Sequence, residues 1–287
     1  MRTLALLVVT AIWGWTFVLV KEGVSEVGPF WFLAVRFAIA TVLTALLLFG
    51  RLRRMRAADW AKGAVLGLAL FGGYFFQTWG LVYTTAQKSG LITGLSVVLV
   101  PPIAYFFGER TQAKTWAGVG LAAVGLSLLI LGGREPLGPT GFGDFLTLLC
   151  AASFALHIVL LDRYTKTGDF LTLLPTQLGV VALLSLLGAL IWEKPTFALS
   201  AQAWSAIWIT GVLATAVAFF VLTWVQRHST AAYTAIVLAT EPAFAAFFGW
   251  LLLGETLRGL QILGAGLVFL GIMIPKLPSP LGPQAPW

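Results

Sequence analysis

The stretch GERTQAKTWAGVGLAAVG at residues 108–125 recurs as GETLRGLQILGAGLVFLG at residues 254–271. The Gly-Glu pair and the glycines after it keep the same register in both copies, 146 residues apart and without a gap. Upstream, Thr84-Thr85-Ala86 aligns with Thr230-Ala231-Ala232 at the same offset. The sequence therefore predicts an internal duplication, with one copy in each half of the chain.

The composition predicts a membrane protein. Charged residues make up 10% of the 287 and apolar residues 59%, whereas soluble domains have about 25% and about 45–50%. The net charge is +7, but the one basic run, Arg51 to Arg56, lies between two apolar segments, where it is a topology signal. We therefore expect no nucleic-acid partner.

The sequence gives no sign of a metal or a cofactor. Cys150 is the single cysteine, which excludes an intrachain disulfide and a multi-cysteine metal site. The two histidines, His157 and His228, have no partner at metal-ligand spacing. We therefore predict neither a metal site nor a cofactor.

Ten stretches are long and apolar enough to cross a bilayer, which needs about 20 apolar residues per helix. They are residues 3–20, 29–49, 61–83, 88–107, 114–132, 142–161, 170–192, 203–224, 230–253 and 257–275. Five spans per copy would force the second copy to lie inverted in the bilayer. The predicted fold is thus an all-α membrane protein of ten transmembrane helices in two inverted five-helix repeats.

The domain boundaries follow from the same pattern. The first repeat covers residues 1–133, a Gly/Pro-rich linker covers 134–141, and the second repeat covers 142–275. Residues 276–287 contain four prolines after Lys276 and predict a disordered cytoplasmic tail. With the amino terminus inside, twelve Lys and Arg residues fall on the inner side and five on the outer side. This bias predicts an inner-membrane protein with both termini in the cytoplasm.

The motifs resemble those of the drug/metabolite transporter superfamily, in its ten-span branch with two EamA domains. The resemblance covers about residues 3–275 and is carried by Trp13-Gly14, Phe17, Lys21, Pro29, Arg36, Gly108-Glu109, Gly118, Gly120, Gly125, Gly143-Asp144, Gln177, Ser229-Thr230-Ala231, Glu241-Pro242, Leu253-Gly254-Glu255 and Gly264-Ala265-Gly266. It implies transport of small metabolites by alternating access, with spans five and ten at the periphery. In the family a proline usually precedes each Gly-Glu pair by about thirteen residues. Pro242 fits this pattern, but Ser96 takes that place in the first half and Pro101-Pro102 follow, so we expect a displaced helix break in span four.

Arg36 and Glu241 are the first candidates for a substrate or coupling site. An ionisable group within the hydrocarbon costs about 2.5–3.5 kcal/mol on insertion scales, so it needs a reason to be there. Arg36 could bind a carboxylate or phosphate, and Glu241 a proton or a cationic group. The alternative is a structural pair that only holds helices together. Pro242 is either a hinge or a static kink.

Other polar and aromatic residues within spans are further candidates. Gln77, Gln177 and His157 must find hydrogen-bond partners away from water, either with a substrate or with neighbouring helices. Trp13 and Trp79 lie deep enough in their spans to line a cavity, although tryptophans also form belts at membrane interfaces. Glu109 and Glu255 each follow a glycine that can end a helix, which favours a structural role. The glycine faces after them could pack within the fold or against a second copy in a homodimer.

The predicted function is secondary active transport of a small polar metabolite, with an amino acid or a related compound as the best guess and export as the direction. The chain has no ATP-binding loop, so an ion gradient or the substrate's own gradient would drive transport. An importer of a phosphorylated sugar or another small anion is an alternative. A membrane enzyme would need a catalytic cluster near an interface, which the short loops lack. A non-transporting scaffold would leave Arg36 and Glu241 unexplained.

Overall fold

The computed structural model describes residues 1–81, 83–84, 86–132, 141–167, 169–253 and 258–276. The described residues are helical and contain no β-strand. The first half holds α1 (Arg2–Val27), α2 (Pro29–Leu47), α3 (Phe49–Leu52), α4 (Ala57–Leu81), α5 (Ala86–Gly94), α6 (Ser96–Phe106) and α7 (Ala113–Leu131). The second half holds α8 (Phe142–Thr165), the short η1 (Phe170–Thr172), α9 (Leu173–Trp192), α10 (Ala201–Gly211), the π-helical η2 (Val212–Val217), α11 (Ala218–Gln226), α12 (Ala231–Leu238), α13 (Glu241–Leu253), α14 (Gly259–Met273) and η3 (Ile274–Lys276).

Seven helical segments within the described residues are long and apolar enough to cross a membrane. They begin at Pro29, Ala113, Phe142, Phe170, Ala201, Ala231 and Gly259. Large apolar side chains cover the outside of the molecule, such as Leu47 at 83% and Phe106 at 86% exposure. Helices satisfy their backbone hydrogen bonds internally, so this apolar surface suits a bilayer. The chain is a multi-pass membrane protein.

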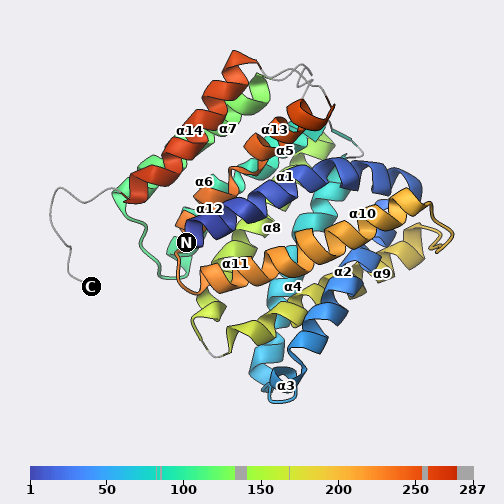
Figure 1. Ribbon diagram of the computed structural model, residues 1–287. Helices are drawn as coiled ribbons and strands as arrows, with labels where there is room; N and C mark the ends of the chain where they lie inside the picture. Colours follow the sequence, from blue (N-terminus) through green and yellow to red (C-terminus); the bar gives the residue numbers. More distant parts are fainter. Residues whose placement is uncertain (82, 85, 133–140, 168, 254–257, 277–287) are drawn as a thin grey trace.

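The helices pack in a regular set of pairs. The closest associations are α7 with α14, α2 with α9, and α4 with α8. Around the centre, α1 packs against α10, α11 and α13, and α6 packs against α8 and α12. Figure 1 shows α7 and α14 side by side at one edge of the molecule, apart from α1, α10 and α11, which run alongside one another.

Glycines allow the close approach of α7 and α14. A Cβ atom at Gly118 would lie 2.7 Å from the Gly271 carbonyl oxygen, and one at Gly125 would lie 2.6 Å from the Gly264 carbonyl oxygen. Small residues at such positions let helix backbones meet in a membrane. Of the two roles expected for these glycine faces, packing within the fold is the one that the structure uses.

Two segments are interrupted at positions that the duplication relates to each other. α5 ends at Gly94 and α6 begins at Ser96, while α12 ends at Leu238 and α13 begins at Glu241. At the 146-residue offset, Leu95 and Ser96 correspond to Glu241 and Pro242. The expected displacement of the first break is therefore wrong, because Pro101 and Pro102 lie inside α6. Pro242 is the second residue of α13, in the first turn, where proline is tolerated.

The turns at the two Gly-Glu pairs, the linker and the carboxy-terminal tail are also predicted from the sequence. Gly108 has φ +86°, which confirms the left-handed turn expected before Glu109. Gly254-Glu255, the linker apart from Gly141, and the tail beyond Lys276 lie outside the described residues.

Candidate functional site

Arg36 lies on α2 and points its guanidinium into the interior, where the residue is 5% exposed. Its Nε donates a hydrogen bond to Thr215 Oγ1 at 2.7 Å. The guanidinium carbon lies 5.5 Å from the centroid of the Phe37 ring and 5.8 Å from that of Tyr74. A buried cation over ring faces gains from their negative quadrupoles. Arg36 is thus held by the Thr215 hydroxyl and lies beside the Phe37 and Tyr74 rings.

The π-helical turn in the segment α10–η2–α11 presents the partners of both Arg36 and Trp13. Thr215 Oγ1 donates to the Thr210 carbonyl, five residues back, at 2.9 Å. The neighbouring Ala214 carbonyl accepts a hydrogen bond from Trp13 Nε1 at 2.8 Å. A π-turn widens the helix and redirects its polar groups, and such turns are frequent at functional sites. Thr215 carries no signal in the sequence, because a threonine within a span most often bonds to its own helix.

Glu241 begins α13 at the interruption after α12 and is partly exposed. The preceding Thr240 lies 2.9 Å from Thr10 through their hydroxyl oxygens, which ties the interruption to α1. Glu241 lies within electrostatic range of Arg36, Tyr74 and Cys150. The ion pairs within the described part of the chain are Arg51–Asp169, Lys62–Asp59 and Lys166–Asp162, and none of them involves Arg36 or Glu241. Arg36 and Glu241 are therefore near each other without forming a direct salt bridge.

Aromatic rings join the remaining members of this central cluster. The Phe219 ring lies 5.8 Å from that of Trp13, 6.4 Å from that of Phe37 and 6.2 Å from that of His157, measured between centroids. Phe219 was not a candidate, because an isolated phenylalanine in an apolar helix carries no signal in the sequence. It connects residues from α1, α2 and α8 into one cluster.

Gln77, Gln177 and His157 have partners in neighbouring helices. Gln77 Nε2 donates to Thr93 Oγ1 at 3.4 Å, and Thr93 Oγ1 lies 3.6 Å from Cys150 Sγ. His157 Nε2 lies 2.7 Å from Gln177 Oε1, with both residues buried. The amide nitrogen of Gln177 is buried without a partner among the described groups.

The structure places Trp79 apart from this cluster. Its ring contacts those of Phe75 and Phe142, at 5.4 and 6.1 Å between centroids, and the residue is 41% exposed. Such a position suits the surface of a membrane protein, where tryptophan often lies at the interface.

Two carboxylates link the α1–α2 connection to the α9–α10 connection. Glu193 accepts backbone hydrogen bonds from Phe30 at 2.9 Å and from Trp31 at 2.7 Å, at the start of α2. Glu26 accepts from the Ser200 amide at 2.7 Å and from its hydroxyl at 2.6 Å, at the start of α10. These hydrogen bonds from Ser200 hold the pKa of the Glu26 carboxyl below its usual value. Each carboxylate thus satisfies the amino-terminal end of a helix from the other connection.

A buried arginine with a carboxylate nearby, at the centre of a lipid-exposed helical fold, is typical of a membrane transporter. A profile of the EamA-like transporter family matches residues 2–131 and 141–275. The chain belongs to this family.

Relatives named as transporters span nearly the whole chain. An uncharacterized transporter of Archaeoglobus fulgidus is 34% identical, over 96% of this chain and 85% of its own length. The uncharacterized transporter YoaV of Bacillus subtilis is 28% identical, over 94% and 95%. The uncharacterized inner membrane transporter YedA of Escherichia coli K12 is 25% identical, over 98% and 92%. A crystal structure of a protein with 19% identity has the same fold, with a TM-score of 0.82 over 96% of both chains.

Proposed function

We propose that this chain is a secondary active transporter that exports a small polar metabolite, such as an amino acid, by alternating access. The observation that carries this proposal is that Arg36 and Glu241, from different halves of the chain, lie within electrostatic range of each other, with two aromatic rings beside the guanidinium. The guanidinium would bind the substrate carboxylate. Glu241 would bind the substrate ammonium group or the coupling proton. Trp13, Phe37, Tyr74 and Phe219 would exclude water and contact apolar parts of the substrate.

The proposed architecture has ten spans in two inverted repeats, residues 1–133 and 142–275. In addition to the seven segments above, three further spans would be formed by α1, by α4, and by α5 together with α6. Helix contacts support the repeat. The contact of α4 with α8 is matched by the contact of α1 with α10 and α11. The contact of α4 with α9 is matched by the contact of α2 with α10. The two family matches, at residues 2–131 and 141–275, also fit two copies.

Substrate access requires the helices around the cluster to move, because Arg36 is only 5% exposed. The breaks between α5 and α6 and between α12 and α13 are the proposed points of movement, with Pro242 at the second. Discontinuous helices at the midplane occur at the substrate sites of many inverted-repeat transporters. With both termini inside, the Glu26 and Glu193 contacts would close the outer side.

Transport in proteoliposomes tests this proposal. Purified protein is reconstituted into proteoliposomes that are loaded with a panel of amino acids, amines, organic anions and phosphorylated sugars. Efflux is then measured with and without a pH gradient. We expect at least one zwitterionic substrate to move faster than in protein-free vesicles. Glu241→Gln should reduce gradient-driven efflux at least tenfold, because it removes the charge. Glu109→Gln, at the hairpin before α7, is the matched control and should transport normally.

Two results would contradict the proposal. If Glu241→Gln keeps the wild-type rate and pH dependence, the carboxylate is structural. If only phosphorylated sugars move, the chain transports anions, and the assignment to amino acids is wrong.

A further inference from the structure

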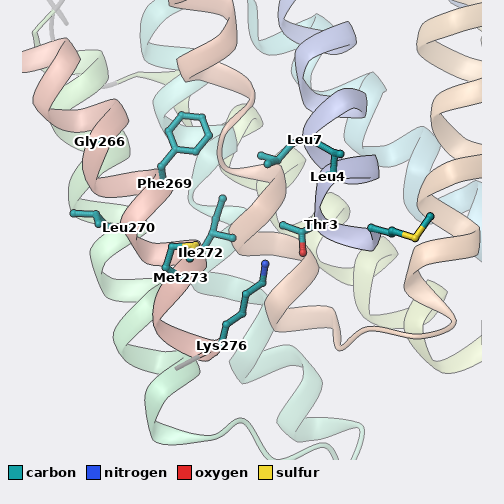
Figure 2. Close-up of a pocket in the computed structure, with 10 residues that line it drawn as sticks. Thr3, Leu4, Leu7, Gly266, Phe269, Leu270, Ile272, Met273 and Lys276 are labelled. Carbon is teal, nitrogen blue, oxygen red and sulfur yellow. The ribbon is translucent and has the colours of Figure 1, made fainter. Parts of the chain in front are cut away.

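A groove opens on the surface between the start of α1 and the end of α14, away from the central cluster (Figure 2). It has a volume of about 690 Å³. Its walls are almost entirely apolar and include Leu4, Leu7, Phe269, Leu270 and Met273. Several of these side chains are highly exposed, with Leu4 at 65% and Leu270 at 57%. An apolar hollow of this kind suits the hydrocarbon of a bilayer.

The extent of the groove matches one leaflet. Along α14 and the following η3 its lining runs from Gly266 to Lys276, which corresponds to about 15 Å at about 1.5 Å of rise per residue. The hydrocarbon core of a bilayer is about 30 Å thick, so one leaflet accounts for about half of it. An acyl chain lying along α14 would therefore fill the groove from the interface toward the midplane.

A polar corner closes the interfacial end of the groove. The Lys276 ammonium lies 5.7 Å from the centroid of the Tyr233 ring, and the Tyr233 hydroxyl lies 3.0 Å from the Thr3 hydroxyl. Figure 2 shows Lys276 and Thr3 at this end, with Leu7 and Phe269 at the other. Among the described lining residues, Lys276 has the charged side chain, and the amino-terminal ammonium group belongs to Met1, which also lines the groove. The nearby Arg2 instead donates from Nη1 to the His228 carbonyl at 3.2 Å.

We propose that this groove binds an anionic glycerophospholipid, with one acyl chain between α1 and α14 and the headgroup phosphate at Lys276. The hydroxyl groups of Thr3 and Tyr233 would hydrogen-bond to the glycerol and ester oxygens. The preference for an anionic headgroup comes from the lysine at the interface, for which the described residues provide no carboxylate partner. This site is separate from the proposed transport site, so either can fail without the other.

Native mass spectrometry tests the lipid site. The full-length protein is exchanged into micelles that contain equal amounts of phosphatidylglycerol and phosphatidylcholine, and the retained lipid is identified by mass. We expect the wild type to retain phosphatidylglycerol at least fivefold over phosphatidylcholine. Lys276→Gln should abolish this preference. Arg2→Gln removes the same charge beside the groove and should keep it.

Two glycines provide a matched steric test. Gly266 lines the groove, and a Cβ there has no atom within 4 Å. Gly120, its counterpart in the duplication, is equally unobstructed on α7 and does not line the groove. Gly266→Leu should fill the groove and abolish lipid retention, while Gly120→Leu should retain lipid as the wild type does. If Gly266→Leu retains the same lipid as Gly120→Leu, or Lys276→Gln keeps the preference, the proposal is wrong.

Discussion

Gly264 and Gly266 lie two residues apart on α14, but only Gly264 is packed against another helix. A Cβ atom at Gly264 would meet the backbone of Leu129 and the carbonyl oxygen of Gly125 on α7. At Gly266 the same atom would meet nothing within 4 Å. Backbone cannot move aside as a flexible side chain can, so the two positions differ in what they tolerate.

Alanine substitutions should separate the two glycines. Gly264→Ala is expected to destabilise the protein by about 1–3 kcal/mol, the usual cost of overpacking. Gly266→Ala should be neutral or stabilising by up to about 1 kcal/mol, because alanine favours the helix over glycine. Thermal unfolding of the purified protein in detergent measures both. An unfolding temperature for Gly264→Ala equal to that of the wild type would mean that α7 and α14 leave room for a Cβ atom at this position.

At the scale of the element, the start of α2 depends on a residue from another connection. Its N-cap, Gly28, has no side chain to accept hydrogen bonds, and the Glu193 carboxylate takes that role at the amides of Phe30 and Trp31. A Cβ at Gly28 would lie 2.8 Å from the Glu193 carboxyl carbon. The glycine therefore leaves the space in which the carboxylate caps the helix.

Removing this cap should destabilise the protein. Glu193→Ala leaves two amides without their acceptor and removes a negative charge from the positive end of the helix, at a cost of about 1–3 kcal/mol. Lys194→Gln changes an exposed neighbour and should stay within about 0.5 kcal/mol of the wild type. Thermal unfolding again gives the comparison. Equal unfolding temperatures for the two variants would show that the cap adds nothing to stability.

At the scale of the whole molecule, the proposed inversion makes a prediction about corresponding loops. Arg53 follows α3 and Lys194 follows α9, at related places in the two repeats. Both residues are exposed. Inverted repeats place them on opposite sides of the membrane, whereas parallel repeats place them on the same side.

Cysteine labelling in intact cells distinguishes these topologies. Arg53→Cys, Lys194→Cys and His228→Cys are each made in a Cys150→Ala background and treated with a membrane-impermeant maleimide. We expect only Lys194→Cys to react until the cells are permeabilised, when all three should react. Reaction of Arg53→Cys and Lys194→Cys from the same side would exclude the inverted arrangement.

Much of the fold could be predicted from the sequence because each membrane helix is a continuous run of apolar residues. Seven of the ten apolar segments match helices long enough to cross a membrane, and the glycine pattern matches the α7–α14 contact. The first helix break could not be predicted from proline, because Pro101 and Pro102 are accommodated inside α6 while the chain breaks at Leu95. Among the candidate residues, Arg36 and Glu241 stood out by charge, whereas Thr215 and Phe219 had no local signal.

The sequence by itself determined that this is a duplicated, all-helical membrane protein, and it singled out two charges that the hydrocarbon would not tolerate without partners. Hydropathy and a repeated motif are properties of the sequence itself, so they can be read without a fold. Only the tertiary structure decided what surrounds those charges. Helices from both halves bring Thr215 and Tyr74 to Arg36, bring Phe219 to the adjacent Phe37, and leave Trp79 at the surface. These partners are distant in the chain, and their contacts depend on how the helices cross.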